Sequence, residues 1–386
     1  MSYNYNDYNS QNQNDQNEEI RFDENDFQNP YSGYYRPPNN NFGQDFKVNE
    51  EPPRYCYTGL LDEENARRNF SRIGRGYALF TAISFVASYL IAYIVFFLNP
   101  EFYETTLFLN LLTPISLYAF SLPVLLIILS RCEAKAPEKR KMKFSTFMIF
   151  VLVSFGLMNL GALVGNSVMD YWSYYFDYDY SNNLQSIIDY DNLWITAIFT
   201  VIVAPIGEEF DFRKLIIDRT QRYGGFISVG LSALIFGLMH GNFYQFFYCF
   251  AIGLVLGYIY YSTGKLHLTI IIHAIVNFVG SILTTFLSPV SEQLALLDPS
   301  DTEALLTFVQ ENIIGIIGVF IYSLFTYAAM AAAIILPIIF RKKIHLDRGE
   351  IYIPKKKIMP IVILNGGVIA MLALYFLEFG LSLMPV

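Results

Sequence analysis

The chain has 386 residues, a net charge of −8 and a composition that is 54% hydrophobic and only 16% charged. A chain this acidic and apolar lacks the basic character that a nucleic-acid partner requires, so no such partner is expected. Its three cysteines, Cys56, Cys132 and Cys249, form neither a disulfide framework nor a CxxC metal motif.

The amino-terminal stretch, residues 1–65, is predicted to be a disordered acidic tail. It is rich in Asn, Gln, Tyr and Pro and holds a charge of −9, so the rest of the chain is close to neutral. Without an apolar period it cannot bury enough surface to offset the entropy of ordering. A solvated tail is favoured over a docking segment for an unidentified protein partner. The polar start is unlike a cleavable secretory signal, so the first apolar helix is expected to stay in the membrane.

Residues 66–386 are predicted to form an all-α, polytopic transmembrane bundle of about eight or nine helices. The apolar runs reach the roughly 20 residues that cross a ~30 Å hydrocarbon core. They follow a basic hinge at residues 67–75. Nine candidate spans lie at about 77–98, 107–130, 144–169, 193–213, 226–241, 243–261, 267–287, 312–340 and 358–383. The fifth is short for a full crossing, so it is expected to tilt or to end within the membrane.

Charged residues in the loops predict the orientation of these spans. The segments 99–106, 170–192 and 288–311 contain acids but no Lys or Arg. By contrast, the basic segments are 131–143, 214–225, the turn at Lys265, and 341–357. Because Lys and Arg are retained on the cytoplasmic side, the chain is expected to be a multi-pass protein of the cell membrane with a cytoplasmic N-terminus.

Two adjacent acids, Glu208 and Glu209, end the fourth apolar run. Charges at membrane depth cost several kcal/mol and mark functional sites by default. Helical spacing places Glu209 and Arg213 on one face, where they can form an ion pair. Glu208 is rotated by about 100° and faces elsewhere. It therefore remains available as a general base, the role that hydrolysis needs.

Two histidines lie in the spans that follow. Phe236 precedes His240 by four residues, so its ring can pack against the imidazole. His273 and Asn277 share a face of the seventh span and could supply the two donors of an oxyanion hole. Taken alone, Asn277 is more typical of a hydrogen bond between helices.

For a third acid of the fourth span, Asp211, two partners are considered. It could pair with Lys214, three residues later, or join Glu208 as a second carboxylate of the site. The pair with Lys214 is favoured.

Together, Glu208-Glu209-x-x-x-Arg213, Phe236-x-x-x-His240 and His273-x-x-x-Asn277 resemble the CPBP family of intramembrane proteases. This family includes the type II CAAX prenyl endopeptidases and the bacteriocin-processing or Abi proteins. The resemblance covers a protease core at about residues 190–285. It implies that Glu208 and His240 activate water, that Glu209 and Arg213 support the site, and that His273 and Asn277 stabilise the oxyanion. Asp211 and Lys214 depart from the family pattern, which is usually apolar at the first position and often Gly at the second.

The resulting hypothesis is an intramembrane endopeptidase that cuts a membrane-associated peptide, for example a prenylated or amphipathic one. The alternative is a non-catalytic scaffold or immunity-type protein with the same fold. A proton-coupled transporter is disfavoured, because the chain lacks repeated halves. The family includes metalloproteases and glutamate-led enzymes, so the resemblance leaves open whether this chain binds a zinc ion. Its ligands would be Glu208, His240 and His273, although no HExxH pair holds them on one helix.

Overall fold

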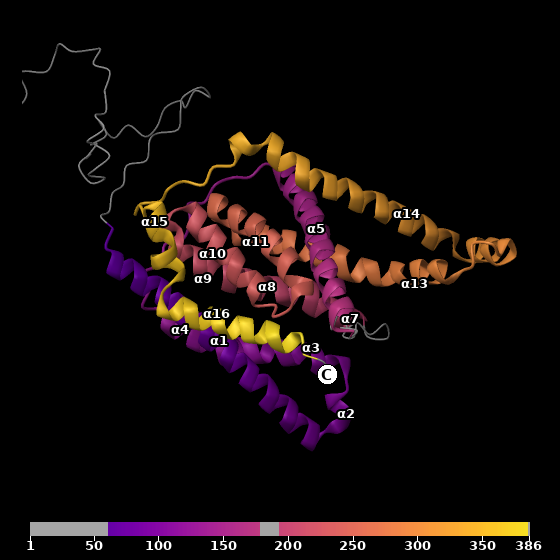
Figure 1. Ribbon diagram of the computed structural model, residues 1–386, viewed down its shortest axis with the longest axis horizontal. Coiled ribbons are helices and arrows are strands. Elements are labelled where there is room, and N and C mark those ends of the chain that lie inside the picture. Colours follow the sequence, from indigo (N-terminus) through magenta and orange to yellow (C-terminus); the bar gives the residue numbers. More distant parts are fainter. Residues whose placement is uncertain (1–60, 178–192, 385–386) are drawn as a thin grey trace, which may run out of the picture. The chain divides into compact units, whose positions relative to one another are not determined.

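The computed structural model describes residues 61–177 and 193–384, in which the regular elements are helices joined by irregular connections, without a β-strand (Figure 1). Almost all of the predicted tail, residues 1–65, lies outside this description. So does part of the acidic loop 170–192. The described residues belong to one compact unit.

Seven helices within the described ranges are long and apolar enough to cross a membrane. Several contain π-helical or 3₁₀-helical turns, both written η. The seven are α1 (Glu63–Leu98), α3–η2–α4 (Thr106–Leu129), α5 (Phe144–Phe176), α7–η4–α8–η5–α9–η6 (Leu193–Tyr223), α11 (Phe243–Thr263), α12–η7–α13 (Leu266–Leu296) and α14 (Thr302–Ile339). A short helix, α2 (Pro100–Tyr103), joins the first two.

Two further elements complete the predicted set of spans. The short fifth span is α10 (Gly225–Leu238), and its 14 residues extend only about 21 Å at 1.5 Å per residue. The ninth is broken into α15–η9 (Lys355–Ile363) and α16 (Gly366–Ser382), which meet at 67°. The prediction of an all-α polytopic bundle is therefore confirmed, with seven spanning helices among the described residues, or eight if the bent pair is one span.

Helix α1 begins well before the predicted first span. Asp62 caps its N-terminus by accepting the main-chain N–H of Asn65, and Glu63 and Glu64 fill the first turn. The arginines of the expected hinge thus lie on the helix, and Arg67 donates to the carbonyl of Leu364 at the break before α16. The basic stretch is the first part of a 36-residue helix rather than a linker.

The basic segments come together at one end of the bundle. The Lys135 N–H donates to the carbonyl of Asp218, and the Arg140 N–H donates to that of Thr263. Lys357 forms an ion pair with Glu63, at the start of α1. Segments 131–143, 214–225 and 341–357 therefore share one face, as the alternation of charge predicts.

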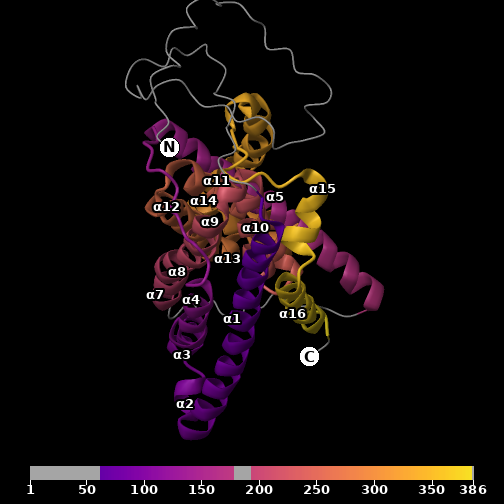
Figure 2. The ribbon, with the colours of Figure 1, turned by 90° about the vertical axis from the view of Figure 1, so that its left-hand side faces the viewer.

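Helices α1 and α16 run side by side (Figures 1 and 2). Glycine makes this contact possible, because a Cβ atom on Gly367 would collide with the main chain of Ser71. Opposite it, Gly74 lies against the backbone of Gly367 and Val368. Farther along the chain, α13 and α14 form a hairpin around residues 297–301 (Figure 1).

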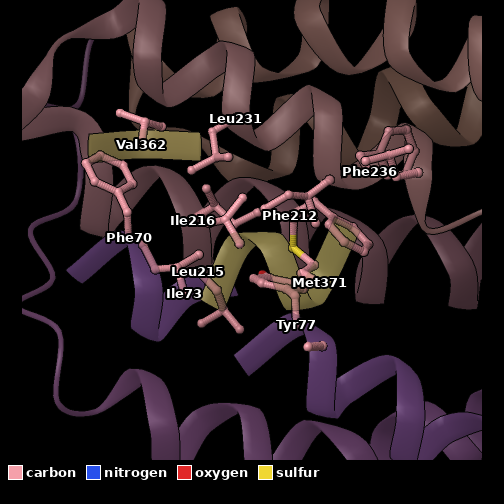
Figure 3. Packing of buried hydrophobic residues seen from close by; sticks show 14 of the residues in the cluster. Phe70, Ile73, Tyr77, Phe212, Leu215, Ile216, Leu231, Phe236, Val362 and Met371 are labelled. Atoms are coloured by element: carbon pink, nitrogen blue, oxygen red, sulfur yellow. The ribbon is translucent and has the colours of Figure 1, made fainter. Parts of the chain in front are cut away.

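The main hydrophobic core lies where α1 and α16 pack against η5, α9 and α10. Figure 3 shows Tyr77 of α1, Phe212 of η5 (Glu209–Lys214), Phe236 of α10 and Met371 of α16 packed together. Each is almost fully buried. The polar residues discussed next lie on the same elements, so this core holds them in place.

Candidate active site

The two acids lie where one long helix changes its winding. Pro205 starts the short helix α8 (Ala204–Glu208), and the following turns, Glu209–Lys214, form the π-helix η5. A preceding π-helical segment, η4, covers Ile198–Val203. Extra residues per turn change which side chains face inward, and π-helical turns recur at functional sites. Here the change directs both Glu209 and Asp211 into the protein.

Glu209 is fully enclosed, and each of its two carboxylate oxygens lies beside a side-chain nitrogen. Its side chain and that of Arg213 are both 0% exposed, and Arg213 Nε lies 3.1 Å from Glu209 Oε2. Its other oxygen, Oε1, lies 3.0 Å from His273 Nδ1. The expected Glu209–Arg213 pair is therefore present, and a third residue from another helix joins it. Because an ionised carboxylate only accepts, His273 donates its Nδ1 proton to Glu209.

Glu208, in contrast, is left open. Its side chain is 23% exposed, and no hydrogen bond to it occurs among the described residues. Its side chain forms an ion-pair contact with His273, whose Nε2 lies 3.7 Å from Glu208 Oε2, beyond hydrogen-bond range. Since Nδ1 of this histidine is held by Glu209, Nε2 is the atom that faces Glu208.

The ring of Phe236 contacts three of the polar side chains of the site. The guanidinium carbon of Arg213 lies 4.3 Å from its centroid, a cation–π contact. The imidazoles of His240 and His273 contact the same ring edge-on, at centroid distances of 5.1 and 5.8 Å. The predicted Phe236–His240 contact is thus present. The contacts of this ring with Arg213 and with His273 were not predicted from the sequence.

His240 has a defined tautomer. Its Nδ1 lies 2.9 Å from the carbonyl oxygen of Phe236, which can only accept, so Nδ1 carries a proton. In the neutral ring Nε2 then holds a lone pair, and the Cys249 thiol donates to it at 3.3 Å. Cys249 on α11 is a neighbour that the sequence reading assigned no role. Only the fold brings it within reach, nine residues after His240.

Asn277 serves helix packing in this structure. Its side-chain amide donates to the carbonyl of Thr200 at 2.9 Å, joining the end of α12 (Leu266–Asn277) to η4. Thr200 lies in a π-helical stretch, where carbonyls are less regularly paired along the helix. One amide proton of Asn277 stays free of this bond, and an oxyanion role would depend on it.

The expected pair of Asp211 with Lys214 is wrong. Lys214 instead forms an ion pair with Asp218 at 3.0 Å, one helical turn later. Asp218 also accepts the hydroxyl of Tyr260, which fixes it beside Lys214. Asp211 is 1% exposed, and its Oδ1 has no hydrogen-bond partner among the described residues. The π-helical turn η5 displaces the i, i+3 relation on which the expectation relied.

A further acid approaches the site from outside the motifs. Glu378 of α16 lies against Gly241, the residue after His240, and a Cβ atom there would collide with its carboxyl group. Gly241 also has a φ of +65°, which favours glycine. Glu378 Oε2 is buried and has no hydrogen-bond partner in the described chain. A single acid within an apolar span is a signal that could have identified it.

The proposed metal ligands do not assemble. Within residues 61–177 and 193–384, no group of three or more His, Cys, Asp or Glu side chains has an arrangement that could hold a metal ion. His273 Nδ1 is taken by Glu209, and His240 Nε2 faces Cys249. Glu208, His240 and His273 therefore do not fit a zinc site as they stand.

Comparison with known proteins agrees with this geometry. Residues 190–279 match the model of the family described as "Type II CAAX prenyl endopeptidase Rce1-like", and all seven named motif residues lie inside that range. YdiL of Bacillus subtilis (strain 168), a suspected membrane peptidase, is 31% identical over 99 residues. The match spans 25% of this chain and 41% of YdiL. No solved structure matches the chain significantly.

Proposed function

We propose that the chain belongs to the CPBP family through its core, residues 190–279, and that it is an intramembrane endopeptidase acting on a membrane-associated peptide. The observation that carries the proposal is the unequal state of two adjacent carboxylates. Glu209 is neutralised by Arg213 and His273, whereas Glu208 is partly exposed and free of hydrogen bonds among the described residues. A general base has to be free to take a proton.

In the proposed reaction, Glu208 activates water. A water molecule that contacts both Glu208 Oε2 and His273 Nε2 gives one proton to the carboxylate while its oxygen attacks the peptide carbonyl carbon. The C–O double bond opens to an oxyanion. When the tetrahedral intermediate collapses, the C–N bond breaks, and Glu208 returns the proton to the leaving amine. One water molecule and one peptide thus yield one acid and one amine.

The remaining motif residues have supporting roles in this proposal. His273 in its doubly protonated form would donate Nε2–H to the oxyanion, since Nδ1–H is committed to Glu209. The free amide proton of Asn277 is the second candidate donor. His240 would assist the water once its Nε2 exchanges Cys249 for a water molecule. Arg213 holds Glu209, and through it orients His273.

The proposed substrate carries an apolar group. A cavity of about 400 Å³ lies between the helix that bears Glu208 and α12, which bears His273. It is open to the surface of the protein, and the side chains that line it are apolar and include Ile206, two residues before Glu208, and Ala274, next to His273. An isoprenoid or an apolar side chain fits this lining, whereas a polar peptide would lose hydrogen bonds there.

The proposal includes the direction of the chain in the membrane. The basic segments gather at one end of the bundle, and the start of α1 lies there too. By the retention of Lys and Arg in the cytoplasm, this end and the N-terminus would be cytoplasmic.

The experiment that tests the proposal uses the purified protein in proteoliposomes. Its substrates are a quenched fluorescent peptide with a farnesylated cysteine near its C-terminus and the same peptide without the lipid. We expect cleavage of the farnesylated form, faster than of the plain form, and a loss of about 10²-fold or more on His273→Ala. If neither peptide is cut and Glu208→Gln preserves the cellular phenotype, the protein is a scaffold.

A further inference from the structure

A second cavity lies at the basic end of the bundle, away from the carboxylates. It has a volume of about 520 Å³ and lies between the segment leading into α5, the end of α11 and the end of α14. Most of its lining falls outside the segment that matches the peptidase family. No residue of the candidate active site contributes to it.

The rim of this cavity is cationic. Arg140, Lys141 and Lys143 line it from the segment before α5, and Lys343 lines it from the turn after α14. Arg140 is balanced by Glu138, whose carboxylate is 3.0 Å away. No Asp or Glu of the described residues lines the cavity, so within that part of the chain the charges of the three lysines have no acidic partner there. Lys343 is held over the ring of Phe340, 5.2 Å from its centroid.

The floor of the cavity is apolar. Phe150 of α5 and Leu336 and Pro337 of α14 form part of it, within two turns of the ends of both helices. Deeper in the bundle the same two helices touch, because Gly156 lets the backbone of Ala329 approach closely. The cavity thus has lysines at its rim, and its apolar lining continues along the line where α5 and α14 meet.

From this arrangement we propose that the cavity binds an anionic glycerophospholipid. Its phosphate would lie among Lys141, Lys143 and Lys343, and its acyl chains would follow the seam between α5 and α14. Basic pockets between transmembrane helices bind anionic headgroups in this way. A small soluble anion would use the lysines alone and leave the apolar floor exposed to water. The charge and the floor together therefore favour a lipid.

The test compares two triple variants of the full chain in detergent micelles. In the first, Lys141→Gln, Lys143→Gln and Lys343→Gln remove the charges of the rim. In the control, Lys139→Gln, Arg341→Gln and Lys342→Gln remove the same charge from neighbouring positions that do not line the cavity. All six side chains are exposed, so both variants should fold. Bound lipid is measured by native mass spectrometry, and the melting temperature with each additive is recorded.

We expect dioleoylphosphatidylglycerol to bind and stabilise the wild type more than dioleoylphosphatidylcholine. The rim variant should bind phosphatidylglycerol about tenfold more weakly or worse, and the control variant should bind it as the wild type does. Equal losses in both variants would overturn the proposal in favour of diffuse surface charge. An equal stabilisation by inorganic phosphate would overturn it in favour of a soluble anion.

Discussion

At the scale of single residues, the polar contacts of the site form two groups, those within one helix and those between helices. The pairs Glu209–Arg213 and Phe236–His240 follow from four-residue spacing. The contacts of Glu209 with His273 and of His240 with Cys249 depend on how the helices pack. Sequence order holds no direct record of that packing. The error at Asp211 has a local cause, because a π-helical turn breaks the assumed periodicity.

Arg213→Ala should destabilise the fold. The change leaves Glu209 buried without its cation and removes the contact with Phe236, and breaking a buried ion pair in this way costs about 3–5 kcal/mol. The measurement is the melting temperature in detergent, with Lys214→Ala as the control because its ion pair is partly exposed. A variant at Arg213 as stable as the control would show that the buried pair contributes no net stability.

Cys132 should react slowly with thiol reagents. Burial raises the pKa of this thiol, and the opposing effect of Arg72, Arg219 and Arg75 is smaller. We expect its alkylation at pH 8 to be slower than in the denatured chain and to rise as the pH increases further. The thiol form favours the fold, so the small stability it contributes is lost as pH rises through the raised pKa. Peptide-level mass spectrometry measures the rate, and equal rates in folded and denatured chains would contradict the expectation.

At the scale of elements, apolar length and charge predict which spans exist, but their ends and breaks depend on tertiary contacts. The apolar period starts at about residue 77, yet α1 starts at Glu63 because its first turns pack against the chain before α16. The last span reads as one apolar run. Asn365 breaks it by accepting the Val368 N–H as a cap and donating to the carbonyls of Ile361 and Val362.

Two adjacent glycines allow a matched test of the α1–α16 contact. A Cβ atom on Gly367 would collide with the Ser71 carbonyl, whereas one on Gly366 would meet no atom within 4 Å. Gly367→Ala should therefore destabilise the protein by about 1–3 kcal/mol, the usual cost of overpacking. Gly366→Ala should be neutral or slightly stabilising. Equal melting temperatures for the two variants would mean that α16 does not pack on α1 as described.

At the scale of the whole molecule, composition predicts a soluble tail and a membrane domain. Deleting residues 1–60 should leave the melting transition of the domain unchanged, since the tail has too little apolar surface to pack against it. Circular dichroism of the purified domain in detergent measures this. Loss of the transition on deletion would show that the tail belongs to the fold.

The charge alternation predicts the orientation of the whole protein. Single cysteines placed in 288–311 should react with an impermeant reagent added outside cells, and those placed in 131–143 or 341–357 should react only after the membrane is opened. The native cysteines are replaced first. Reaction of the basic segments from outside would reverse the orientation.

The central claim is that Glu208 is the general base and that Glu209 holds the site together. The direct test measures kcat on the farnesylated peptide for Glu208→Gln and for Glu209→Gln. The melting temperature of each variant is measured as well. Glu208→Gln should lower kcat by about 10²–10⁴-fold and leave stability intact, because the open carboxylate bonds to no other described residue. Glu209→Gln should lower the melting temperature, because it removes the negative charge that Arg213 faces. If Glu208→Gln cleaves the peptide as fast as the wild type, the assignment of the base, and with it the proposed mechanism, is contradicted.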